Sequence, residues 1–344
     1  MSAERISKEK RKQILLAMGE GAPVNSMCRM FSVGKHALLR FMVEAAEAME
    51  DWHDKHFRGL TVKRLEIDEQ WSFVQIHKER MTAAQKAENP NQGDCWLWAC
   101  IDADTKALIS WKTGKRSLLA AHRFSRDIAA RVDGPTQVTS DCLAGYRYAI
   151  PAAFGDRVNY ATEKKKFHTD WKPDASYLKK GVDRIVGMER RAVKGSPVLS
   201  TATVCHIERY FLTTRHSNRR LTRKTIAHSR LWENHAAANS IHVFLYNVVR
   251  KHEALDGRTP AQAIGVTGKR WSLDEVTAMV DAFHKEKEDA AFESAFASSN
   301  FVVQPRAKRT YAPVKPKTPW YLDPHSGGKF CPADQKQADV DYTA

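Results

Sequence analysis

The chain has 344 residues, and 55 lysines and arginines against 40 aspartates and glutamates give it a formal net charge of +15 at pH 7. This length allows a sizeable core and two or three units, and the positive charge favours a polyanionic partner unless it only solvates the surface. No segment is apolar and long enough to predict a membrane span, and the first residues lack the apolar core of a signal peptide.

The first sixty residues predict an all-α unit. The stretch KEKRKQILLAMGEG predicts a helix that ends at a glycine turn, and APVNSMCRMFSVGKHALLRFMVEAAEAM predicts a short helix, a break at Val33-Gly34 and a longer helix. This order is the helix-turn-helix plan, in which the second helix meets DNA. We expect Lys35, His36 and Arg40, at the start of that helix, to contact base edges and phosphates. An ordinary three-helix bundle is the alternative interpretation.

From Leu65 the pattern changes to strands. LEIDEQWSFVQIH predicts one strand, and CWLWACIDADTKALISWKTG predicts two more, joined by an Asx-type turn at Asp102. An amphipathic helix, SLLAAHRFSRDIAARV, then precedes the strands TQVTSD and DRVNYAT. Three consecutive strands followed by strand–helix alternation predict an α/β fold with a mixed sheet and helices packed on it. The first strand carries Glu66, Asp68 and Gln70 on one side, which a half-solvated strand would explain.

The remaining sequence predicts three further segments. These are a basic, irregular insertion near 163–197, a helical region from Thr201 to about Val249 closed by glycine and proline, and a C-terminal helix with an extended, partly disordered tail. The predicted domains are a helix-turn-helix domain at 1–60, an α/β domain at 61–265 that includes the insertion, and the segment 266–344.

Three carboxylates lie where such a fold could bring them together. Asp68 is within a strand, Asp141 ends a later strand, and Glu208 begins a run from 209 to 230 with seven lysines or arginines and no acid. If residues 206–224 form one helix, Glu208 shares a face with Arg215 and Arg219. A merely solvated basic face is the simpler alternative.

Clustered carboxylates suit phosphodiester chemistry. Two divalent ions about 3.5–4 Å apart can activate an oxygen nucleophile and stabilise the leaving oxygen. Mg²⁺ or Mn²⁺ prefers oxygen ligands, so two aspartates and one glutamate suffice, and substrate phosphate completes the coordination. The six cysteines form no C-x-x-C pair, so we expect reduced thiols and no zinc.

The sequence resembles the DDE-class transposases of bacterial insertion sequences and is most similar to the insertion-sequence-one group. The resemblance spans roughly residues 65–249 and rests on DEQW (68–71), WLWACIDADT, the TSD that ends at residue 141, IER (207–209), RRLTRKT (219–225) and YNVVRKHEALDGRTPAQAIG. It implies a ribonuclease H-like fold in which Asp68, Asp141 and Glu208 are the catalytic metal ligands.

The chain departs from that group in three respects. It lacks the cysteine-rich zinc finger ahead of the helix-turn-helix, its interval from Asp141 to Glu208 is longer than is typical, and Tyr210-Phe211 stands where asparagines are common. Glu163 and Glu189 remain alternative third carboxylates.

The predicted function is a DNA transposase that binds element ends and uses two Mg²⁺ or Mn²⁺ ions per site to cut DNA and join it to a target. Its expected partners are double-stranded DNA of the terminal inverted repeats and of the target, and further copies in a homodimer or larger assembly, in the cytoplasm at the nucleoid. The expected phosphate contacts are Arg215, Arg219, Arg220, Arg223 and Lys224. A non-catalytic DNA-binding regulator and a metal-dependent nuclease without strand transfer are the alternatives.

Overall fold

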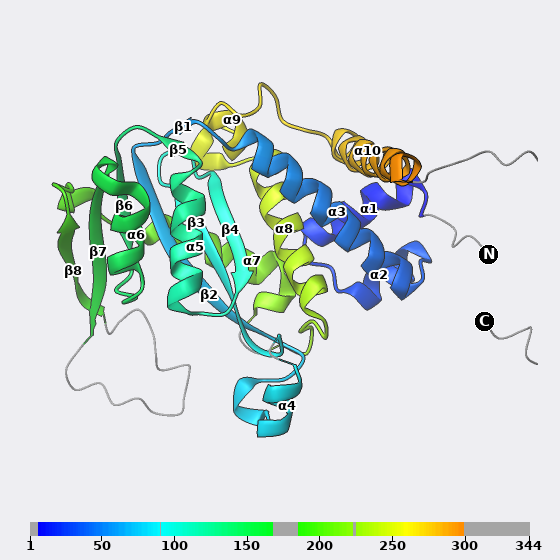
Figure 1. The fold of residues 1–344 in the computed structure, drawn as a ribbon, viewed down its shortest axis with the longest axis horizontal. Coiled ribbons are helices and arrows are strands. Elements are labelled where there is room, and N and C mark those ends of the chain that lie inside the picture. The colour runs from blue at the N-terminus through cyan, green and yellow to red at the C-terminus, as the bar shows by residue number, and fades with distance from the viewer. Residues whose placement is uncertain (1–5, 90, 168–184, 223–224, 299–344) are drawn as a thin grey trace, which may run out of the picture. The chain divides into compact units, whose positions relative to one another are not determined.

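The computed structural model describes residues 6–89, 91–167, 185–222 and 225–298, which form a six-stranded mixed sheet flanked by helices (Figure 1). The strands of this sheet are β2 (Arg64–Val74), β3 (Gly93–Asp102), β4 (Leu108–Gly114), β6 (Thr136–Ser140), β7 (Val158–Phe167) and β8 (Ile185–Lys194). The main helices are α1 (Lys8–Gly19), α2 (Val24–Phe31), α3 (Lys35–His56), α5 (Leu118–Ala129), α6 (Tyr146–Phe154), α7 (Cys205–Ser217), α8 (Trp232–Val248) and α10 (Leu273–Ser298). The short elements are β1 (Leu60–Thr61), β5 (Val132–Asp133), α4 (Ala83–Glu88) and α9 (Pro260–Ala263).

The sheet has the order β4-β3-β2-β6-β7-β8. Strands β2, β3 and β4 form an antiparallel meander, β6 and β7 continue parallel to β2, and β8 is antiparallel to β7. The predicted order of three strands followed by strand–helix alternation is confirmed. The predicted turn is also confirmed, because the Asp102 carboxylate accepts hydrogen bonds from the backbone N–H groups of Asp104 (3.3 Å) and Thr105 (3.1 Å).

Alternation along the central strands divides the core into two layers. Trp98 of β3 packs against Phe124 of α5 and Tyr146 of α6, whereas Leu97 and Ala99 belong to a cluster with α7 and α8. Figure 1 shows α5 and α6 in front of the sheet and α7 behind it. Ala99 pairs with Asp68 of β2, so the polar side of β2 faces α7. That side is covered by a helix, and the half-solvated interpretation of β2 is wrong.

The N-terminal helices share a core with the rest of the chain. Helix α8 lies between the sheet and α3, and Trp52 of α3 packs edge-on against Phe244 of α8 and against Trp271 (Figure 1). Residues 1–291 form one compact unit, and residues 292–344 form a second, of which the structure describes only the end of α10. The sequence predicted a separate domain at 1–60, but the buried side of α3 is covered by residues of the predicted α/β domain.

The predicted irregular insertion near 163–197 is wrong in its described parts. Residues 163–167 continue β7, and β8 pairs with them. Glu163 lies opposite Arg190, whose Nε donates to Glu163 Oε1 at 3.0 Å. Strand β8 is at the edge of the sheet and is partly exposed on both faces, so it carries charged residues instead of alternating apolar ones. Ion pairs with β7 stabilise it, and the sequence therefore lacks the apolar alternation by which a strand is predicted.

The predicted single helix at 206–224 is also wrong, because α7 ends at Ser217. Asn218 leaves the helical conformation and is held in place by two bonds of its amide. Its Oδ1 accepts from the backbone N–H of Arg220 at 3.3 Å, and its Nδ2 donates to Asn239 of α8 at 3.0 Å. Among the residues that the structure describes, no helix has the length and apolar character to cross a membrane.

Candidate active site

Asp68 lies on β2, and Asp141 directly follows the neighbouring parallel strand β6. Asp68 is in the middle of its strand, and the last residue of β6, Ser140, pairs with Ile67. Backbone N–H groups orient both carboxylates: Asp68 Oδ1 accepts from Glu69 (2.8 Å), and Asp141 Oδ1 accepts from Leu143 (2.9 Å). One carboxylate oxygen from each of Asp68, Glu69 and Asp141 lies within 4.8 Å of the other two. The strand pairing therefore builds a compact cluster of oxygen donors.

The charges in this cluster repel one another. Burial raises the pKa of Asp68 to about 8, and the negative charges of Asp141, Glu69 and Glu208 add to the rise. Burial also raises the pKa of Glu69 to about 7, against the opposing effects of the Tyr146 hydroxyl and of Arg116. A divalent cation would relieve this repulsion, and the all-oxygen donor set suits a hard cation such as Mg²⁺.

Glu208 lies beside the cluster, not within it. It is in the first turn of α7, on the side of β2 that carries Asp68, and its side chain is 38 % exposed. Its carboxylate is close enough to raise the pKa of Asp68, but it forms an ion pair with Lys165 of β7. Of the three carboxylates predicted from the sequence, two meet and the third is held nearby by a lysine.

The alternative third carboxylates have other partners. Glu163 is buried, and its Oε2 accepts from the backbone N–H of Val204 at 3.0 Å, just before α7 begins. Glu189 lies on β8 and forms ion pairs with Arg191 and Lys166. Glu163 therefore joins β7 to β8 and to the start of α7, whereas Glu189 pairs with one lysine of β7 and one arginine of its own strand.

Two functional candidates were missed by sequence reasoning. Glu69 adjoins Asp68 in the DEQW stretch and could have been suspected there. Arg116, in the connection after β4, gives no sequence signal, because only folding brings it to the site. Its Nε donates to Glu69 Oε2 at 3.1 Å, one of its terminal nitrogens lies 3.6 Å from Asp141, and its guanidinium stacks 4.8 Å from the Trp96 ring.

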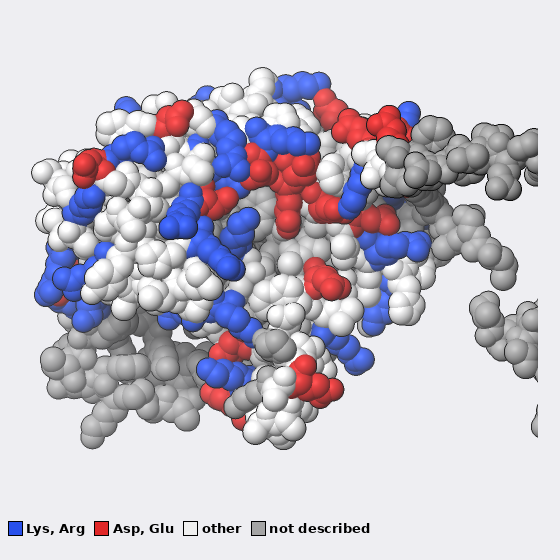
Figure 2. Space-filling model, viewed as in Figure 1, with Lys and Arg blue, Asp and Glu red and all other residues white. Residues whose placement is uncertain are grey.

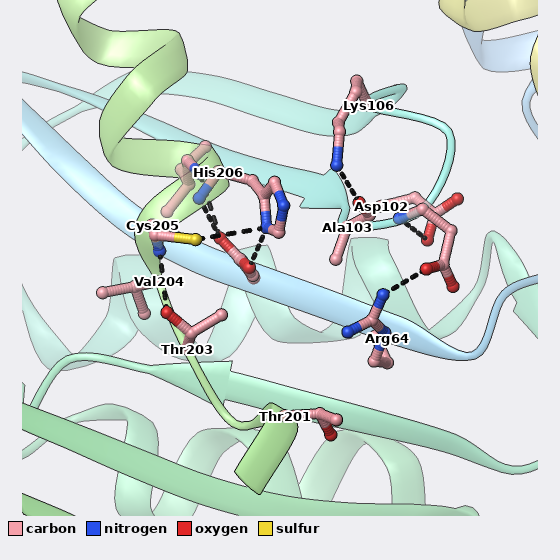
Figure 3. Close-up of polar contacts among 12 residues, drawn as sticks. Arg64, Asp102, Ala103, Lys106, Thr201, Thr203, Val204, Cys205 and His206 are labelled. Carbon is pink, nitrogen blue, oxygen red and sulfur yellow. Dashed lines mark hydrogen bonds and ion pairs between the residues drawn. The ribbon is translucent and has the colours of Figure 1, made fainter. Parts of the chain in front are cut away.

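Side chains of β2 set the position of α7. The buried carboxylate of Glu66 accepts from the backbone N–H groups of His206 (2.8 Å) and Ile207 (3.0 Å), which have no partners within the helix. Four residues along β2, Gln70 Oε1 accepts from the Thr214 hydroxyl at 2.6 Å. Figure 3 shows the beginning of α7, where Cys205 and His206 lie together above β2. Both ends of α7 are thus fixed to the strand that carries Asp68.

The predicted DNA contacts of α3 are accessible. Lys35, His36 and Arg40 are exposed in its first two turns, and Arg40 lies 3.7 Å from Glu44. The later part of α3 is acidic, and Figure 2 shows acidic side chains gathered along α3 on the face in view, with basic side chains over α5. The start of α3 is therefore basic, whereas its later part mixes exposed basic residues with acids.

The predicted basic contacts near α7 have different environments. Arg215 is half-buried on α7, whereas Arg219 is exposed in a short 3₁₀ turn after the helix, so they share no helical face. Arg220 turns inward, its Nε donates to the Ser229 hydroxyl at 2.9 Å, and burial lowers its pKa to about 10. Arg223 and Lys224 lie outside the described residues.

Comparisons with known proteins gave weak structural likenesses. No family model and no curated protein matches the sequence. The chain is similar to a piggyBac transposase in a synaptic complex with hairpin DNA, with 10% identity, a TM-score of 0.37, and coverage of 88% of this chain and 80% of that one.

It is also similar to the Mos1 transposase in two complexes. The paired-end complex with the left transposon end gives 12% identity and a TM-score of 0.19 over 47% of this chain and 59% of that one. The strand transfer complex gives 11% identity and a TM-score of 0.21 over 70% and 76%. At these TM-scores the likenesses do not bear on function.

Proposed function

We propose that this chain is a DNA transposase whose catalytic domain has a ribonuclease H-like fold. The observation that carries the proposal is the convergence of Asp68 and Asp141 from two adjacent parallel strands, with Glu208 on the helix that covers them. An antiparallel meander followed by two parallel strands supports the same fold. The positive net charge of +15 fits a nucleic-acid substrate.

Asp68, Asp141 and Glu208 would hold Mg²⁺ or Mn²⁺, with Glu69 near enough to be a further ligand. The donors are all carboxylate oxygens, and their repulsion in the free protein is the physical reason why a cation should bind there. When bound, such ions polarise a phosphodiester and activate the attacking oxygen.

The neighbouring cations organise these carboxylates. Arg116 lies against Glu69 and Asp141 and limits their movement. Lys165 holds Glu208 at the edge of the site. An incoming DNA phosphate offers Lys165 a competing anion, and Glu208 can then turn toward Asp68. On this view, substrate binding completes the ligand set, which would restrict cleavage to the DNA-bound state.

The test is an assay of the full chain with Mg²⁺ and DNA that carries the ends of its element, with cleaved and joined products measured separately. We expect both products from the unmodified chain. Asp68→Asn, Asp141→Asn and Glu208→Gln should abolish both while DNA binding persists, whereas the matched control Glu189→Gln should keep activity. Cleavage without joining would indicate a nuclease, and binding without cleavage a regulator; either result overturns the proposal.

A further inference from the structure

A second cluster of potential metal ligands lies next to the carboxylate site. It consists of Glu66 on β2 and of Cys205 and His206 at the start of α7. A carboxylate oxygen of Glu66, His206 Nδ1 and Cys205 Sγ all lie within 4.8 Å of one another. Figure 3 shows Cys205 and His206 side by side, with the Asp102–Lys106 turn close to them.

We propose that Glu66, Cys205 and His206 bind a divalent ion of the zinc class. A thiolate and an imidazole select borderline and soft cations over Mg²⁺, so this site differs in chemistry from the carboxylate cluster. Solvent would supply the fourth ligand, because Cys205 is exposed and the His206 side chain is 29 % exposed. The proposal is independent of the transposase function.

One of the two donor distances matches that of a tetrahedral site. Zn–S and Zn–N bonds of about 2.3 and 2.0–2.1 Å place their donor atoms roughly 3.5 Å apart at a tetrahedral angle. Cys205 Sγ and His206 Nδ1 are 3.6 Å apart. His206 Nδ1 and Glu66 Oε1 are closer, at 2.6 Å, because a proton lies between them. Metal binding would release the thiol proton and shift the imidazole proton from Nδ1 to Nε2, and the imidazole would move outward by a fraction of an ångström.

The surroundings already hold one ligand in place. The other oxygen of Glu66, Oε2, accepts the two backbone N–H groups at the start of α7, which fixes the carboxylate and leaves Oε1 for the ion.

A bound ion would fasten the first turn of α7 to β2. Because Glu208 is in that turn, the ion would restrain the carboxylate proposed to act beside Asp68. We therefore expect zinc to raise the melting temperature of the metal-free chain by several degrees, an effect that depends on Cys205.

The test uses Co²⁺ as a spectroscopic probe on the reduced, metal-free full chain. We expect thiolate-to-cobalt charge-transfer absorption that Zn²⁺ abolishes by displacement. Cys205→Ser should remove this absorption, and His206→Gln should weaken Co²⁺ binding at least tenfold. Two controls should keep the absorption: Cys142→Ser, which removes the other exposed thiol among the described residues, and Asp68→Asn, which disables the carboxylate cluster.

Three outcomes would overturn the proposal: no charge-transfer absorption in the unmodified chain, absorption that persists in Cys205→Ser, or absorption lost in Cys142→Ser. Circular dichroism of each variant separates loss of the site from loss of the fold. Should Cys205→Ser misfold, Cys205→Ala supplies the same comparison, since this exposed side chain contributes little packing.

Discussion

The folded protein disfavours the charged form of Asp68, so the folding stability of the chain depends on the protonation of this carboxylate. Its pKa is about 8 in the folded chain, against about 3.9 for an unperturbed aspartate. Between these two values the folded state binds more protons than the unfolded state, so folding stability falls as the pH rises through this window. Above pH 8 this loss of folding stability is complete, and each unit by which the pKa is raised corresponds to about 1.4 kcal/mol of stability.

We predict that Asp68→Asn removes this loss, because the amide does not titrate. In chelator, the variant should be more stable than the unmodified chain at pH 8.5 by on the order of 1–4 kcal/mol, and the difference should shrink toward pH 5. Urea unfolding at several pH values measures this difference in the free energy of unfolding. Mg²⁺ should reduce the difference, because it stabilises only the unmodified chain. Parallel stability curves for the two proteins would contradict the raised pKa.

The ion pair between Lys165 and Glu208 should weaken metal binding in the DNA-free chain. Lys165→Met frees Glu208 and removes a positive charge from the site, so Mn²⁺ should bind the DNA-free chain several-fold more tightly. Lys166→Met is the matched control, because the next lysine of β7 pairs with Glu189 instead, at 3.5 Å. Calorimetric titration measures the Mn²⁺ affinity of the two variants. Equal affinities in the two variants would mean that Lys165 does not restrain Glu208.

Among the elements, the end of α7 changes what its basic residues can do. Because the helix stops at Ser217, Arg220 turns into the protein toward Ser229, while Arg219 remains exposed. Arg220→Ala should therefore destabilise the fold by about 1–3 kcal/mol, through the lost hydrogen bond and packing. Arg219→Ala should leave stability within about 0.5 kcal/mol and, if it contacts a phosphate, lower the log–log salt slope of DNA binding by about 0.9.

Thermal unfolding and salt-dependent DNA binding of both variants decide between these roles. If Arg220→Ala instead kept the stability of the unmodified chain and lowered the salt slope of DNA binding, the continuous basic helix predicted from the sequence would be supported.

The same elements show what the sequence can and cannot predict. The succession of the first three strands along the chain was predictable because β2, β3 and β4 carry strong apolar patterns, and the Asp102 turn was predictable because its signal is local. The end of α7 was not, because it depends on Asn218 meeting Asn239 of a distant helix. Strand β8 was missed because its cross-strand ion pairs replace apolar alternation. Arg116 was missed because only the tertiary fold brings it to Asp141.

In the whole molecule, the N-terminal helices and the sheet are joined by α8. Leu38 and Met42 of α3 are fully buried in a core that includes Ile241 and Phe244 of α8. Residues 1–60 made alone would expose this surface, so DNA binding by α3 has to be tested in the full chain. The acidic side chains later in α3 add a second restriction, because they would repel DNA from that part of the helix.

We therefore predict that only the start of α3 contributes to DNA binding. Lys35→Ala and Arg40→Ala should each lower the log–log salt slope by about 0.9, because each would remove one phosphate contact. Lys55→Ala is the matched control. It removes an exposed lysine at the other end of the same helix, 2.7 Å from Asp51, where the surrounding acids should keep DNA away. Fluorescence anisotropy with end-containing and random duplexes, at several salt concentrations, measures the slopes.

Base-edge contacts would add a second effect. If His36 reads a base, His36→Ala should reduce the preference for end-containing over random duplex by about 1–3 kcal/mol, whereas Lys35→Ala should weaken binding to both duplexes equally. A slope lowered equally by Lys35→Ala and Lys55→Ala would show that α3 contributes only general positive charge. Unchanged binding in all four variants would make the first three helices a structural bundle, and the DNA contacts would then belong to basic residues nearer α7.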